Sequence, residues 1–175
     1  ATAVTDALEV QLVPTAKAKV ALGGTQNPDA YDAYLRGMNQ LNNHPDEAGA
    51  RSAAAALDEA LRLDPGFALA YAARSRVRSI LANTWANEVT LAEKLNAEAR
   101  ADADRAIQLA PLLGAAYEAR ATLIWGSSLN FAAAEADARR AIELEPGSLA
   151  ALRTFSRIAA SQRRTAEALE RAARA

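Results

Sequence analysis

Catalytic side chains are scarce in this sequence. Its one histidine is His44, and it has no cysteine. A serine–histidine–acid arrangement would therefore have to be built around His44, and a cysteine nucleophile is excluded. His44 stands in the polar stretch Asn-Asn-His-Pro-Asp, which is typical of a surface turn. The motifs HExxH, GxxxxGK(S/T) and GxGxxG are all missing from the sequence. We therefore expect no enzymatic activity from this chain.

Metal and cofactor sites have equally little support. A lone histidine and scattered acids, without cysteine, make no cluster with the spacing of metal ligands. The pair Gly23-Gly24 lacks the strand–loop–helix setting that a phosphate cradle requires. Many carboxylates stand near an arginine, as Glu135 stands four residues before Arg139, and such pairs are typical of solvated helix faces. We expect neither a metal nor a cofactor.

The charge balance of the chain argues against nucleic acid as its partner. The 20 basic and 21 acidic residues nearly cancel, giving a formal net charge of −1, whereas a nucleic-acid surface needs excess cations to neutralise phosphates. One arginine cluster could supply a local patch: Arg153, Arg157, Arg163, Arg164 and Arg171. Glu167 and Glu170 dilute it, and no aromatic stacking platform accompanies it, so nucleic acid is the weakest partner hypothesis. No apolar run approaches the ~20 residues of a membrane span.

Helices must position whatever residues bind a partner. Apolar residues make up 51% of the sequence and aromatic residues only 5%, because alanine dominates the apolar set. Alanine is the best helix former and lets helices approach closely. A β-sheet would need many more β-branched and aromatic residues in alternation. The composition therefore predicts an all-α protein, and the missing cysteines leave its compartment open.

A proline recurs at a spacing close to ~34 residues, the length of a helical repeat. The prolines are Pro28, Pro65, Pro111 and Pro146, and the residues six places later are Tyr34, Tyr71, Tyr117 and Leu152. Counting back five, eight and twelve places from the last three prolines gives Ala60, Leu57 and Ala53, then Ala106, Ala103 and Ala99, then Ala141, Ala138 and Ala134. This phasing indicates one copied structural unit, with units near 28–64, 65–110, 111–145 and 146–175.

Each unit is expected to form two helices. The second unit carries an insertion of about 12 residues, which we assign to a loop at 83–89 and to a longer second helix that starts at the capping-box pattern Thr90-Leu-Ala-Glu. Trp85 in that loop is expected to pack locally, with partner contact as the alternative. The last unit is predicted as two helices, 148–161 and 165–175. Two short helices in a lead-in of residues 1–26 bring the expected total to ten.

The arrangement of residues 27–175 resembles the tetratricopeptide repeat (TPR) family. The helix endings Leu63-Asp64-Pro65, Leu109-Ala110-Pro111 and Leu144-Glu145-Pro146 carry the resemblance, together with the aromatic and alanine positions above. The family's glycine on the first helix is replaced by Met38, Ser75, Ala121 and Ser156. The resemblance implies a right-handed α-solenoid of about four repeats, whose concave face, lined by the first helix of each unit, binds a peptide or a partner domain.

TPR-like geometry places five positions of each first helix on that face: the second, fifth, ninth, twelfth and thirteenth. The candidate site residues taken from them are Leu35, Asn39, Asn42, Asn43, Leu69, Arg76, Ile80, Glu118, Thr122, Trp125, Arg153 and Arg157. Their amides suit a peptide backbone, their arginines suit carboxylates, and their apolar members could anchor side chains. Each apolar member could equally pack internally, and each arginine could be solvated or paired. Chaperone-tail clamps have lysine at the fifth position, where this chain has Leu35 and Ala72, which argues against that subtype.

A second resemblance concerns the start of the chain. Leu8, Val10 and Leu12, followed by the stretch from Asn27 to Gly37, resemble the junction where a C-terminal TPR region begins in bacterial class III adenylate/guanylate cyclases and winged-helix regulators. That resemblance implies a catalytic or DNA-binding domain upstream of residue 1. Two functional hypotheses follow. The chain is an interaction scaffold that binds a partner in its groove, or it is a regulatory module that forms a homo-oligomer through its uncapped last repeat.

Overall fold

The computed structural model describes residues 23–128 and 130–173, with side chains up to residue 165. These residues form helices joined by short turns and include no β-strand. The α-helices are α2 (Pro28–Asn43), α3 (Glu47–Leu63), α4 (Ala68–Ile80), α5 (Val89–Leu109), α6 (Gly114–Ser127), α7 (Phe131–Leu144) and α8 (Leu149–Ala173). The expected all-α class is confirmed. The helices predicted at 1–12 and 15–22 lie outside the described residues.

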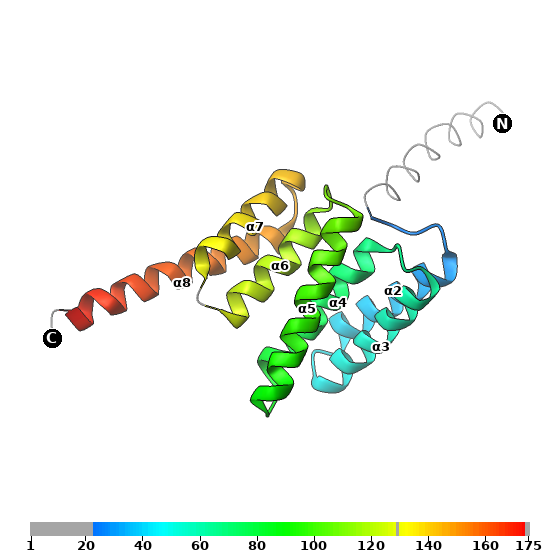
Figure 1. Cartoon of the computed structure of the whole chain (residues 1–175), viewed down its shortest axis with the longest axis horizontal. Helices are drawn as coiled ribbons and strands as arrows, with labels where there is room; N and C mark the ends of the chain where they lie inside the picture. Colours follow the sequence, from blue (N-terminus) through cyan, green and yellow to red (C-terminus); the bar gives the residue numbers. More distant parts are fainter. Residues whose placement is uncertain (1–22, 129, 174–175) are drawn as a thin grey trace.

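The helices are arranged as successive hairpins. Helices α2 and α3, α4 and α5, and α6 and α7 pair with each other, and the hairpins follow one another along the long axis of the molecule (Figure 1). Helix α4 packs against α3 and α6, and α8 packs against both α6 and α7. The first helices of the four units, α2, α4, α6 and α8, therefore lie in a row, as the repeat pattern predicts.

Small side chains hold each hairpin together. The eight phased alanines and Leu57 are all 0% exposed. Because an alanine adds only one carbon beyond the backbone, helices that meet at these positions approach closely, and a larger side chain would have to push them apart. Phe67, also 0% exposed, fills the space at the start of α4 and packs on the ring of Tyr34 at 5.3 Å between ring centroids.

The insertion in the second unit is built differently from the prediction. Helix α4 continues into a π-helical turn, η1 (Leu81–Trp85), where we expected a loop. Such a turn takes up extra residues without ending the helix. Helix α5 then begins at Val89, and its N-cap residue is Glu88, which has an extended backbone. Thr90 therefore lies inside the first turn of the helix, so the predicted capping box at Thr90 is wrong. Trp85 packs against the core of the first two units, which confirms its predicted local packing.

The last unit also differs from the prediction, because one continuous helix, α8, replaces the two expected helices. Residues 161–165, Ser-Gln-Arg-Arg-Thr, contain neither glycine nor proline, so no residue there stops the helix. No described segment folds back over the start of α8, where Leu149 is 68% and Leu152 is 41% exposed. Helix α8 instead extends beyond the α6–α7 hairpin (Figure 1).

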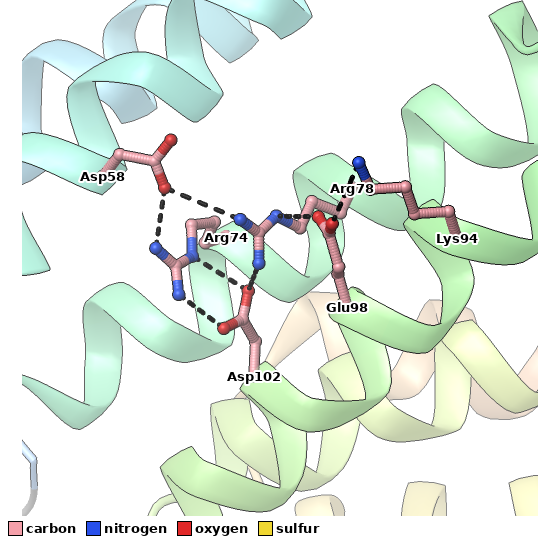
Figure 2. Close-up of polar contacts among 6 residues, drawn as sticks. All are labelled: Asp58, Arg74, Arg78, Lys94, Glu98 and Asp102. Atoms are coloured by element: carbon pink, nitrogen blue, oxygen red, sulfur yellow. Dashed lines mark hydrogen bonds and ion pairs between the residues drawn. The ribbon is translucent and has the colours of Figure 1, made fainter. Parts of the chain in front are cut away.

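An ion-pair cluster joins the first hairpin to the second (Figure 2). Arg74 of α4 binds Asp58 of α3 and Asp102 of α5, each at 2.6 Å. Arg78, one turn later, binds Asp102 at 2.7 Å and approaches Glu98 at 3.4 Å. Asp102 is only 4% exposed, and its two arginine partners offset the loss of water around the carboxylate. Burial lowers the pKa of Arg74, but the hydrogen bonds and charges of Asp102 and Asp58 outweigh burial and raise it overall.

The same arrangement recurs between the second and third hairpins. Arg120 of α6 binds Asp137 of α7 at 2.7 Å and Asp104 of α5 at 2.9 Å. The hydrogen bond to Asp137 is the main reason why the pKa of Arg120 is raised, against the effect of burial. Arg74 and Arg120 both stand seventh in their helices. The seventh residue of α8 is Phe155, whose ring is instead covered by the guanidinium of Arg139, 5.1 Å from the ring centroid.

Removing the shared carboxylate should weaken the whole array. We expect Asp102→Ala to lower the free energy of unfolding by about 3 kcal/mol, because it strands two partly buried guanidinium groups. Urea denaturation followed by circular dichroism measures the loss. The control is Asp58→Ala, which removes a side chain that is 54% exposed and should cost less than about 1 kcal/mol. Equal losses in the two variants would contradict the role given to Asp102.

Candidate functional site

Helix α4 presents arginines in two directions. Arg74 and Arg78 reach α3 and α5, whereas Arg76 lies about 200° around the helix from Arg74. Arg76 lines a pocket with residues of α2 and α6, and it makes no hydrogen bond or ion pair with any residue that the structure describes. The cluster in Figure 2 thus fixes which side of α4 faces the pocket.

The pocket lies between the first helices of three successive units. It encloses about 310 Å³ of space, part of it open to solvent, and is lined by Tyr34, Met38, Leu69, Ala72, Ala73, Arg76, Ala115 and Glu118. Five of these residues occupy the second, fifth or ninth position of α4 or α6: Leu69, Ala72, Arg76, Ala115 and Glu118. The structure therefore brings three of the predicted site residues, Leu69, Arg76 and Glu118, into one pocket.

Side-chain size explains why a hollow exists at this point. Ala72, Ala73 and Ala115 are too small to fill the space between the larger Met38 and Leu69. The wall contributed by α2 includes Tyr34, whose ring also lies against Tyr31 at 6.1 Å. Burial raises the pKa of Tyr34, and the positive charge of Arg76 partly opposes the rise. The phenol and the guanidinium are thus close enough to interact electrostatically.

Glu118 is a buried acid with an unusual set of partners. The residue is 6% exposed, and its Oε1 accepts hydrogen bonds from Thr122 Oγ1 and Thr154 Oγ1, both at 2.9 Å. Its Oε2 accepts no hydrogen bond from any described residue. This oxygen is in contact with solvent. No described lysine or arginine lies within ion-pair distance of this carboxylate, unlike the carboxylates of Asp102 and Asp137.

Two of the predicted site residues contact each other instead of lining the pocket. The guanidinium of Arg157 lies 4.2 Å from the ring centroid of Trp125. The indole Nε1 of Trp125 donates a hydrogen bond to Ser161 Oγ at 3.0 Å. Both contacts join α6 to α8, so the aromatic face and the polar end of this tryptophan already have partners. Trp125 and Arg157 act here as packing between repeats.

The remaining predicted site residues lie outside the pocket. Thr122 joins the site indirectly, through its hydrogen bond to Glu118. The others are Leu35, Asn39, Asn42, Asn43, Ile80 and Arg153, of which all but the half-buried Ile80 are exposed. His44 is exposed where α2 ends, as expected for a turn residue.

Sequence reasoning missed Tyr34, Met38 and Thr154 as site residues. The first two stood at positions that the repeat assigns to packing between helices. The position of Thr154 could have identified it from the sequence. It is the sixth residue of α8, and the sixth residues of α4 and α6 are the buried alanines Ala73 and Ala119. A threonine at a buried alanine position needs a hydrogen-bond acceptor, and Glu118 is that acceptor.

Comparison with known proteins identifies the fold. No family model and no curated protein matches the chain. The first TPR of Spaghetti (RPAP3), solved bound to the HSP90 peptide SRMEEVD, superposes with a TM-score of 0.59 and 18% identity over 79% of this chain and 96% of that one. The Arabidopsis OM64 TPR domain gives a TM-score of 0.58 and 19% identity over 77% of this chain and 97% of that one. The chain therefore has the predicted TPR-like solenoid fold.

Within residues 23–128 and 130–173, no group of histidine, cysteine or acidic residues is arranged to hold a metal ion. In the same part of the chain, no helix combines the length and apolar character that crossing a bilayer requires.

The titration of Tyr34 reports on the position of Arg76. Its pKa lies above 10.0 because burial favours the neutral phenol, so this group contributes stability at lower pH that is lost as the pH rises through its folded pKa. Replacing Arg76 with Gln removes the opposing cation, and we expect the pKa of Tyr34 to rise further.

The measurement is the ultraviolet absorbance of tyrosinate against pH, taken as the difference between each protein and its Tyr34→Phe counterpart. Arg51→Gln is the control, because Arg51 is exposed and pairs with Glu47 on α3. A pKa of Tyr34 that does not change in Arg76→Gln would contradict the placement of Arg76 at the pocket.

Proposed function

We propose that the chain is a non-catalytic protein-interaction scaffold that binds a peptide segment or a partner domain on the concave face of α2, α4 and α6. The observation that supports this most is the contrast between arginines. Arg74, Arg78 and Arg120 are held by acids, while Arg76, at the pocket, is held by none of the described residues. A guanidinium in that state is ready to bind a carboxylate, and the adjacent Leu69 offers an apolar contact.

The fold supports the same proposal. The TPR of Spaghetti holds an HSP90 peptide, so a solenoid of this kind can present a surface for a peptide. We propose a different class of ligand for this chain, since Leu35 and Ala72 stand at the fifth TPR position of the first two units and neither carries a charge. Leu35 is 45% exposed on α2, one residue after Tyr34 of the pocket wall.

A random peptide library displayed on phage tests the scaffold. We expect the chain to enrich peptides, and Arg76→Glu to weaken their binding at least ~10-fold, which corresponds to about 1.4 kcal/mol. Fluorescence polarisation with a selected peptide measures the affinity. The control is Arg51→Glu, whose side chain is 62% exposed on α3, and it should bind as the unchanged protein does. Failure to enrich any peptide, or equal binding by Arg76→Glu, would remove the proposal.

A second candidate function is self-association through α8. The observation in its favour is that Leu149 and Leu152 at the start of α8 are 68% and 41% exposed, with no described helix covering them. Exposed apolar side chains next to each other mark an interaction surface, and a second copy of the chain could cover this one. The start of the sequence resembles the junction before the TPR region of larger signalling enzymes and transcriptional regulators. In such a protein, the contact between two copies through α8 would regulate the activity of the other domain.

Light scattering on the chain at micromolar concentrations tests self-association. We expect a monomer–dimer equilibrium that Leu152→Glu shifts to the monomer, because a charge at this position opposes burial. Leu112→Glu is the matched control, since Leu112 is 60% exposed but lies before α6. A strictly monomeric protein across the range would count against this function.

A further inference from the structure

Glu118 is a buried acid whose Oε1 is held by two threonine hydroxyls and whose Oε2 has no partner among the described residues. We propose that the pocket receives a lysine or arginine side chain of the bound segment, whose cation pairs with Glu118 Oε2 while a neighbouring acidic group of the segment pairs with Arg76. This inference rests on the proposed scaffold function, and it specifies the chemistry of the partner segment.

Burial of the Glu118 carboxylate costs free energy. The buried acids among the described residues are Asp102, Glu118 and Asp137, at 4%, 6% and 9% exposure. A buried carboxylate loses several kcal/mol of hydration, which is about what one well-placed cation restores. Asp102 and Asp137 have that cation in the form of arginine, whereas Glu118 has only hydroxyl groups. The chain therefore carries one buried charge that its own described residues leave without an opposite charge.

The two oxygens of Glu118 have different surroundings. Oε1 lies 2.9 Å from the hydroxyls of Thr122 and Thr154, which also lie 3.2 Å from each other, and each hydroxyl has one hydrogen to donate. The two hydroxyls hold the carboxylate in place and leave Oε2 unbound but accessible. A lysine or arginine side chain donates several hydrogen bonds and accepts none, so it suits Oε2, which accepts none from the described residues.

The pocket is shaped for a single long side chain. Met38, Leu69 and the small alanines form walls suited to the aliphatic stem of a basic side chain, with the charged end at Glu118. The hollow is small and partly open to solvent, so it suits one side chain better than a packed helix. Arg76 lies on the neighbouring helix, so a segment with one acid and one base close together satisfies both charges.

A positional-scanning library of soluble peptides tests the proposal. We expect the chain to select lysine or arginine at one position and aspartate or glutamate nearby. Glu118→Gln keeps the acceptor for both threonines but loses the charge, so it should lose the basic preference and bind the best peptide at least ~10-fold more weakly. Arg76→Gln should keep the basic preference and lose the acidic one.

The outcomes separate this inference from the scaffold itself. Peptides that bind with no basic preference, or a basic preference that survives in Glu118→Gln, would overturn the role of Glu118 and leave the scaffold standing. If no peptide binds at all, both proposals fail together.

Thermal unfolding adds a test that needs no ligand. If Glu118 serves a partner, Glu118→Gln should have the same Tm as the unchanged chain or a higher one, because it removes an unpaired buried charge and keeps the hydrogen bonds. Asp137→Asn is the matched control and should lower the Tm, because it weakens the pairing of Arg120. A comparable fall in Tm for Glu118→Gln would assign Glu118 to the structure and overturn the proposal.

Discussion

The shared carboxylate of Asp102 is the interaction on which the site depends. Two arginines of α4, one turn apart, converge on it from the same side of the helix. A helix held at two such points cannot rotate without breaking a buried ion pair. The phased alanines fix how close the helices come, and the ion pairs fix how α4 is turned. Together they leave Arg76 and Leu69 facing the row of first helices.

Local pattern was enough to predict the repeats, and it named three of the residues that line the pocket. The period of the prolines and alanines gave the hairpin succession, and the second, fifth and ninth residues of α4 line one pocket with the second and fifth residues of α6. The failures have physical causes. The break expected before residue 165 relied on repeat phase, but a helix continues unless a residue stops it. The capping box at Thr90 matched in sequence, but the chain becomes helical one residue earlier. Thr154 bonds to Glu118 and Ser161 bonds to Trp125, and in each pair the two residues are 36 positions apart in the sequence. A local sequence pattern does not encode contacts of this kind.

Two groups of charged residues in the described chain have different roles. One group is paired between hairpins and holds the solenoid together, as Arg74, Arg120 and their acids do. The other group, Arg76 and Glu118, lines a single pocket and has no counter-ion among the described residues. Folding alone would favour removing such charges, so their presence favours a partner that supplies the missing ones. The same reasoning moves Trp125 and Arg157 from the candidate site to the packing between α6 and α8.

The division between paired and unpaired arginines can be measured directly by NMR. Arg74 and Arg120 each donate Nε–H to a carboxylate, so the exchange of these protons with water should be slow. Arg76 should exchange its Nε–H at the rate of a free arginine side chain in the absence of a partner. If the Nε–H of Arg76 is protected to the same degree as that of Arg74, the pocket has no unpaired cation and the account of the site is wrong.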